Sequence, residues 1–178
     1  MKYILLFALI LTISCDNASK IWNFLVGYVT KEGAAGIMGN LYAESALNPA
    51  VYETSKHKAI GYSNEEYVRK VNSGEYTRSK FMNDGAGFGL AQWTYYTRKA
   101  ALYDHCKGRI ADLTCQLEYL HIEFKSDFAK LFSYLKSSHD LKECSTRVLK
   151  QFERPANADA KVNERYQYSL KYYNQFKW

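Results

Sequence analysis

Glu44 is the residue whose place in the sequence most directly suggests catalysis. In a helix, Ile37, Leu41 and Glu44 would fall at positions i, i+4 and i+7, which share one face. The apolar residues mark that face as the packed one, so we expect the carboxyl group to lie away from open water. Desolvation and the negative end of a helix dipole both favour a carboxylic acid over a carboxylate. A carboxyl group that keeps its proton can act as a general acid. The alternative is a core helix whose terminal glutamate is solvated.

The stretch before Glu44 carries a glycine at every third position, namely Gly33, Gly36 and Gly39. Each of these glycines costs about 0.5–1 kcal/mol relative to alanine inside a helix. In return, a smooth stripe lets another helix or a ligand come close. The sequence Asn48-Pro49 disfavours further helix, so we expect the helix to end near Ser45.

A second stretch, residues 84–94, alternates glycines at positions 85, 87 and 89. It is not a phosphate-binding loop, because no Gly-Lys-Ser/Thr follows, and it lacks the preceding strand of a dinucleotide fingerprint. Alternate glycines allow close approach to the backbone, here beside Gln92 and Trp93. A sugar fits this description, with backbone groups for its hydroxyl and N-acetyl groups and an indole for its ring face. The alternative is a turn whose Trp93 belongs to the core.

The composition indicates one soluble globular domain with a substantial core. The chain has 178 residues, 47% of them hydrophobic and 24% charged, and is rich in tyrosine, with 16. Tyrosine suits sugars or bases, although most aromatic residues of a helical protein are core. The net charge of +6 favours an anionic partner such as nucleic acid, a membrane surface or a cell wall. The basic residues are scattered, so we expect no nucleic-acid-binding arm.

The N-terminus resembles an export signal. A short basic start precedes an apolar run from Tyr3 to Ile13, too short to span a bilayer. We therefore expect a signal peptide over residues 1–15, a mature domain over 16–178, a secreted monomer and no stable membrane insertion. Export predicts at least one disulfide among the cysteines at positions 106, 115 and 144, with the fate of Cys15 left open. The neighbouring histidines match no zinc spacing, so we expect neither metal nor cofactor.

The remaining periodicity predicts helices and no strands. We expect helices over 18–29, from a cap at Ser63 to Gly74, over 97–106, 110–124, 128–136 with a cap at Asp127, 140–153 and 159–176. Residues 46–62 and 83–95 should be irregular loops, and both lie close to the stretches described above.

The two stretches together resemble the phage tail lysozyme family. The resemblance rests on residues 39–49 (GNLYAESALNP) and 87–94 (GFGLAQWT), with weaker support from residues 151–156 and Arg165, and extends over about residues 20–176. It implies a mainly α, lysozyme-like domain of the goose-type or lytic transglycosylase-like kind, with long active-site loops. It also implies peptidoglycan as the substrate.

The resemblance implies that Glu44 is the catalytic acid, and that Ser45 beside it, together with Gly89, Gln92 and Trp93, binds the substrate. The substrate bond would be the β-1,4 link between N-acetylmuramic acid and N-acetylglucosamine. A second carboxylate is expected in glycosidases, and Asp84 is our candidate, ahead of Glu53, Glu65 and Glu75. Substrate-assisted chemistry and a lytic transglycosylase remain alternatives. A non-catalytic cell-wall binder and a membrane-disrupting protein are the rivals from other classes.

Overall fold

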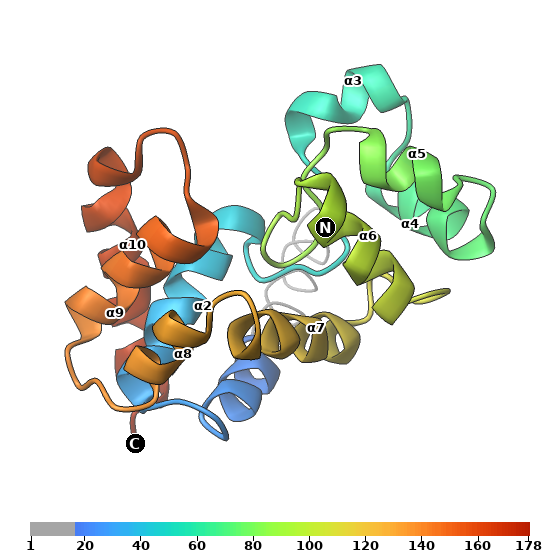
Figure 1. Cartoon of the computed structure of the whole chain (residues 1–178). Helices are drawn as coiled ribbons and strands as arrows, with labels where there is room; N and C mark the ends of the chain where they lie inside the picture. Colours follow the sequence, from blue (N-terminus) through green and yellow to red (C-terminus); the bar gives the residue numbers. More distant parts are fainter. Residues whose placement is uncertain (1–16) are drawn as a thin grey trace, which may run out of the picture. The chain divides into compact units, whose positions relative to one another are not determined.

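The computed structural model describes residues 17–178, which are mainly helical, with two isolated β-bridges in place of strands (Figure 1). The predicted signal peptide lies outside the described residues. The chain divides into two compact units. The first consists of the chain up to Leu47 together with Glu123–Trp178, and the second is Asn48–Ile122.

The first unit packs several helices around α2 (Lys31–Ser45). Residues 17–25 form the first described helix. The later elements are α8 (Ala129–Leu135), α9 (Leu141–Arg147), a π-helical segment (Val148–Glu153) that continues α9, and α10 (Ala158–Phe176). Figure 1 shows α2 beside α9 and α10, and residues 33–41 of α2 are all buried. The helix is therefore enclosed by protein along most of its length rather than packed through one face.

Local signals set both ends of α2. Its N-cap is Thr30, whose hydroxyl accepts a hydrogen bond from the Gly33 N–H at 3.0 Å. At the other end Ala46 adopts a left-handed conformation with φ 53°, and its N–H bonds to the Tyr42 carbonyl. The predicted helix end near Ser45 is confirmed.

The glycines of α2 make room for other helices. A Cβ atom on Gly39 would overlap Ser169 of α10, and one on Gly36 would lie 3.0 Å from Cys144 of α9. The close approach predicted from the glycine spacing is thus used by protein, at the contacts of α2 with α9 and α10.

The second unit holds shorter helices and the irregular segments. Its elements are a 3₁₀ turn (Thr54–Lys56), α3 (His57–Ile60), α4 (Asn64–Ser73), α5 (Arg78–Asn83), α6 (Tyr96–His105) and α7 (Leu113–Lys125) as far as Ile122. Ser63 caps α4 by accepting from the Glu66 N–H, and Gly74 ends that helix in a left-handed conformation, as predicted. A disulfide joins Cys106, at the end of α6, to Cys115 in α7, which confirms the predicted bridge.

Several element boundaries differ from those predicted. The first helix stops at residue 25, and the long helix predicted over 140–153 changes from α to π at Val148. Asp127 does not cap α8, whose N-cap position is Phe128 and has no side-chain cap. Helices α3 and α5 were not predicted, because each is too short to show a full amphipathic period. None of the helices in residues 17–178 is both long and apolar enough to cross a membrane.

Candidate functional site

Glu44 lies in the last turn of α2, and its carboxyl group pairs with a buried arginine. The Glu44 Oε1 atom accepts a hydrogen bond from Arg165 Nη2 of α10 at 2.6 Å. The Glu44 side chain is 22% exposed and that of Arg165 only 4%. The carboxyl group has left open water, as predicted, but it meets a guanidinium group instead of the apolar side chains predicted around it.

Arg165 belongs to a buried polar layer between α2, α9 and α10. Its Nη1 atom donates to the Asn40 carbonyl at 3.0 Å. The Asn40 amide in turn donates to the Gly36 carbonyl at 2.9 Å and to the Ser145 carbonyl at 3.1 Å. The Ser169 hydroxyl lies 3.0 Å from that of Ser145. The Asn40 carbonyl ties the guanidinium group to this layer, and Glu44 lies at its partly exposed end.

Ser45, the predicted neighbour of the acid, is buried. Its hydroxyl donates to the Leu41 carbonyl of the preceding turn at 3.1 Å. This bond within the helix directs the side chain toward the α2 backbone. A role for Ser45 in binding substrate stays a prediction.

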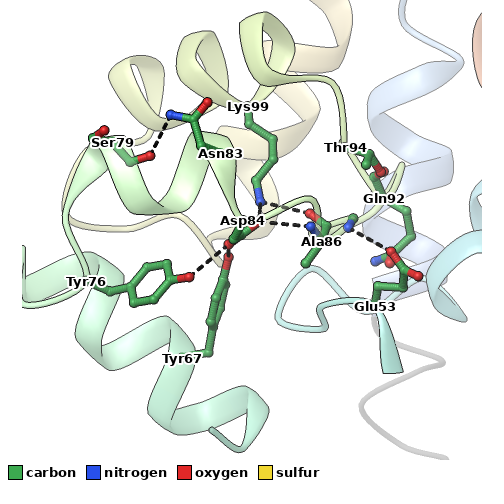
Figure 2. Close-up of polar contacts among 11 residues, drawn as sticks. Glu53, Tyr67, Tyr76, Ser79, Asn83, Asp84, Ala86, Gln92, Thr94 and Lys99 are labelled. Carbon is green, nitrogen blue, oxygen red and sulfur yellow. Dashed lines mark hydrogen bonds and ion pairs between the residues drawn. The ribbon is translucent and has the colours of Figure 1, made fainter. Parts of the chain in front are cut away.

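Asp84, the predicted second carboxylate, lies in the second unit with only 4% of its side chain exposed. Figure 2 shows it surrounded by partners from several elements. Its Oδ1 atom lies 2.5 Å from Lys99 Nζ and accepts from the Ala86 N–H at 2.9 Å. Its Oδ2 atom accepts from the Tyr67 hydroxyl at 2.6 Å and from the Tyr76 hydroxyl at 3.4 Å. Both oxygens are occupied, so the surroundings of Asp84 favour a structural role over that of a base or nucleophile.

The electrostatics of this cluster follow from burial. The Lys99 side chain is fully buried, and burial lowers its pKa, while the Asp84 carboxylate acts in the opposite direction. Burial, followed by the negative charge of Asp84, raises the pKa of Tyr76 to about 12. The same causes raise the pKa of Tyr67 far above its ordinary value. Both tyrosines therefore stay neutral donors to Asp84 over the physiological range.

The glycine-rich segment after Asp84 forms a tight turn. The backbone groups of Phe88 and Trp93 exchange two hydrogen bonds, at 3.2 and 3.0 Å. Gly89 has φ 73°, and a Cβ atom there would lie 2.5 Å from the Gln116 Oε1 atom. That amide oxygen accepts from the Leu90 N–H at 2.9 Å. The structure thus uses Gly89 for a close approach of Gln116, and its predicted contact with substrate stays untested.

The side chains of Gln92 and Trp93 both face the protein. Gln92 has φ 44°, and its amide donates to the Gly89 carbonyl at 3.0 Å and to the Val51 carbonyl at 3.3 Å. The Trp93 indole is 0% exposed and lies 5.4 Å from the Tyr119 ring. The interpretation of this indole as an open surface for a sugar ring is therefore corrected. The Trp93 backbone closes the turn by pairing with Phe88, and the part of its side chain in substrate placement stays a prediction.

Near this turn lie Glu53, a carboxylate that the sequence ranks behind Asp84, and two accessible tyrosines that the sequence did not single out. Glu53 is half-buried, and its Oε2 atom accepts from the Gly87 N–H at 3.3 Å. The sequence shows this glutamate but not that the chain returns beside Gly87. Tyr95 and Tyr96 follow the turn directly and are exposed, with ring centroids 4.9 Å apart. Their place immediately after Trp93 and Thr94 is the signal that could have identified them as accessible aromatic faces.

One group of metal-ligand types comes together in the described part of the chain, namely His105, Cys106 and Cys115. The two sulfur atoms form the disulfide, so they are not available as thiolate ligands. This group carries no metal-dependent chemistry.

A comparison with protein families identifies one relationship. The family described as phage tail lysozyme matches residues 16–176, almost the whole chain. The match includes α2 with Glu44, the turn from Gly87 to Trp93, and α10 with Arg165. No curated protein matches the chain.

Proposed function

Because the chain belongs to the phage tail lysozyme family, whose activity is lysozyme-like hydrolysis of peptidoglycan, we propose that it is a muramidase. The bond cut is the β-1,4 link between N-acetylmuramic acid and N-acetylglucosamine. The protein acts as a secreted monomer, on bacteria outside the producing cell or in a digestive compartment.

The observation that carries this proposal is how the two oxygens of the Glu44 carboxyl group are bonded and exposed. One oxygen, Oε1, is held by Arg165 at 2.6 Å, and the side chain is partly exposed. Among residues 17–178, no partner holds its other oxygen, Oε2. This arrangement suits a general acid. The protein orients one oxygen, and the other can present a proton to the leaving oxygen of the substrate.

In the first chemical step Glu44 transfers its proton to the glycosidic oxygen as the bond to C1 of the muramic acid breaks. Positive charge develops on that sugar ring, and water completes the hydrolysis. The exposed tyrosines Tyr95 and Tyr96 support a saccharide substrate, because tyrosine offers a flat apolar face with a polar edge.

A lytic transglycosylase is the second candidate, and the burial of Asp84 favours it. With both Asp84 oxygens occupied, the sugar's own 6-hydroxyl could attack C1 in place of water. Mass spectrometry of the released fragments separates the two reactions. Hydrolysis yields reducing muramic acid ends, whereas transglycosylation yields 1,6-anhydro ends that are lighter by one water.

The test of the proposed function is Glu44→Gln, assayed on purified peptidoglycan. We expect at least about a 10²-fold loss of turnover, the lower end of general acid catalysis, with folding and cell-wall binding retained. Glu164→Gln is the matched control, because Glu164 is an exposed glutamate of the same unit. Near-normal turnover by Glu44→Gln would refute the assignment. Bacterial killing that survives in this variant would point to membrane disruption, and a wild-type protein that binds without turnover would point to a cell-wall-binding protein.

A further inference from the structure

We infer that Arg165 is a positioning residue for the general acid: it holds one oxygen of Glu44 so that the other faces the substrate. The inference rests on the proposed function and adds a residue from the far end of the sequence to the catalytic apparatus. All of the contacts that support it lie within the first unit.

The guanidinium group of Arg165 spans the last turn of α2. One arm donates to the Asn40 carbonyl and the other to the carboxylate of Glu44, at 3.0 and 2.6 Å. Asn40 and Glu44 are four residues apart, so they stand one above the other on the helix. The planar, rigid fork of arginine fits two acceptors at once, and a lysine ammonium could not reproduce this geometry. The bond to Asn40 orients the guanidinium group, and the bond to Glu44 then holds the Oε1 atom in place.

The part of α10 that carries Arg165 is held in place by its neighbours. Ser169 of α10, one turn after Arg165, donates to the Arg165 carbonyl at 2.9 Å and contacts Ser145 of α9. Close packing of α10 on Gly39 leaves little room for this part of the helix to move. Because Arg165 is buried on α10, the packing of the helices determines where its side chain lies.

The polar layer is not fully satisfied within the described residues. The Nε atom of Arg165 and the Oδ1 atom of Asn40 are buried and have no hydrogen-bond partner. Leaving buried polar atoms unpaired is unfavourable, and a residue kept only for stability would be replaceable by an apolar one. The hydrogen bond from its Nη2 atom to Glu44 gives a reason for an arginine at this position despite the unfavourable unpaired atoms.

The hydrogen bond between Arg165 and Glu44 would assist the proton transfer from Glu44 to the substrate. With Oε1 bonded to Arg165, Oε2 is the oxygen left open to carry the proton of the acid form. When that proton moves to the leaving oxygen, the electron pair of the broken C1–O bond goes to the same oxygen, and Glu44 becomes a carboxylate. Arg165, the charged group in contact with Glu44 among the described residues, then stabilises the new negative charge without reorganisation.

The test compares Arg165→Gln with wild type in steady-state kinetics on soluble peptidoglycan fragments. We expect kcat to fall about 10²-fold, the loss typical of a displaced catalytic group, with KM little changed. Arg147→Gln is the matched control, since it removes a partly exposed Arg–Glu pair of the same unit and should leave both kcat and KM unchanged.

A double variant separates positioning from a purely structural role. If Arg165 acts through Glu44, then adding Arg165→Gln to Glu44→Gln should cause no further loss of the residual, single-turnover activity. An equal further loss in both backgrounds would overturn the inference. Arg165→Lys provides a milder variant if Arg165→Gln does not fold. It should show an intermediate kcat, and wild-type kcat in a folded Arg165→Lys protein would also overturn the inference.

The outcomes distinguish the inference from the function on which it rests. An inactive Glu44→Gln with a fully active Arg165→Gln would refute the positioning role and leave the muramidase assignment standing. An active Glu44→Gln would refute the acid itself, whatever the arginine variants do.

Discussion

Two ion pairs hold the two acidic residues that the sequence singles out, and they differ in what they leave accessible. In the Asp84–Lys99 pair both side chains are almost completely buried, and the tyrosines Tyr67 and Tyr76 occupy the remaining carboxylate oxygen. In the Glu44–Arg165 pair only the arginine is buried, and one carboxylate oxygen has no described partner. At the scale of single residues, the first arrangement encloses its carboxylate, whereas the second leaves one carboxyl oxygen accessible.

The Asp84→Asn variant tests this distinction. Removing one member of a buried pair leaves Lys99 without its counter-charge, so we expect the free energy of unfolding to fall by about 3–5 kcal/mol. Chemical denaturation measures the loss, with Asp127→Asn as a control, because Asp127 is exposed and caps no helix. A large decrease in kcat at unchanged stability would instead show that Asp84 takes part in the chemistry.

The tyrosines bound to Asp84 predict a loss of stability at alkaline pH. The pKa of Tyr76 is raised from 10.0 to about 12 in the folded protein. A group whose pKa is raised by folding contributes stability that is complete below its unfolded pKa and is lost as pH rises through the folded one. We therefore expect the free energy of unfolding to decrease between about pH 10 and pH 12. The decrease, measured by urea titration at several pH values, should be smaller in Tyr76→Phe. An identical pH dependence in both proteins would contradict the assignment.

At the scale of elements, α2 is the helix on which the candidate site depends. It has glycines where it meets α9 and α10, so the backbones approach closely at Gly36 and Gly39. This packing determines where Arg165 of α10 lies relative to the last turn of α2. The glycines of this stretch therefore act on the site indirectly, through the distance between helices.

The Gly39→Ala variant should show this dependence. Alanine favours the helix by up to about 1 kcal/mol, but its Cβ atom would overlap the Ser169 backbone, and overpacking costs about 1–3 kcal/mol. Since the clash is with backbone, we expect net destabilisation, measured by thermal unfolding. Gly27→Ala is the control, because a Cβ atom there meets only the Phe24 carbonyl, at 3.3 Å. A Gly39→Ala protein as stable as wild type would mean that α2 and α10 separate easily.

At the scale of the whole molecule, the fold combines two compact helical units with a single disulfide among the described cysteines. The bridge closes a short loop between α6 and α7 in the second unit. The third described cysteine, Cys144, is buried in the first unit, and burial raises the pKa of its thiol. A buried thiol of raised pKa carries little thiolate and should react slowly.

The disulfide predicts two measurable properties. Non-reducing mass spectrometry after proteolysis should recover a peptide pair linked through Cys106 and Cys115, with Cys144 as a free thiol. Replacing both bridged cysteines by serine should lower the free energy of unfolding by about 2–4 kcal/mol, since the unfolded chain gains freedom. Replacing Cys144 alone should leave the bridge intact. A linked peptide containing Cys144 would contradict the pairing.

Features that depend on neighbours within about one helical turn were determined by the sequence alone. The helical class, the end of α2 near Ser45, the Ser63 cap of α4 and the helix before Gly108 are of this kind. They follow from periodicity, capping side chains and the restrictions that proline and glycine place on the backbone. The motif around Glu44 and the stretch over residues 87–94 together also identified the family, because their residue types are specific in combination.

Only the tertiary structure decided what surrounds each candidate residue. Arg165 lies 121 positions from Glu44 in the chain, and Lys99 lies on the helix that follows the turn after Asp84. Trp93 is enclosed by the core although its sequence context equally suited an exposed ring. Burial and ion pairing arise from which elements pack together, and that packing is set by contacts across the whole chain rather than by local spacing. The sequence therefore identified the candidate residues, whereas their partners and exposure, and the chemistry that follows from these, depended on the tertiary structure.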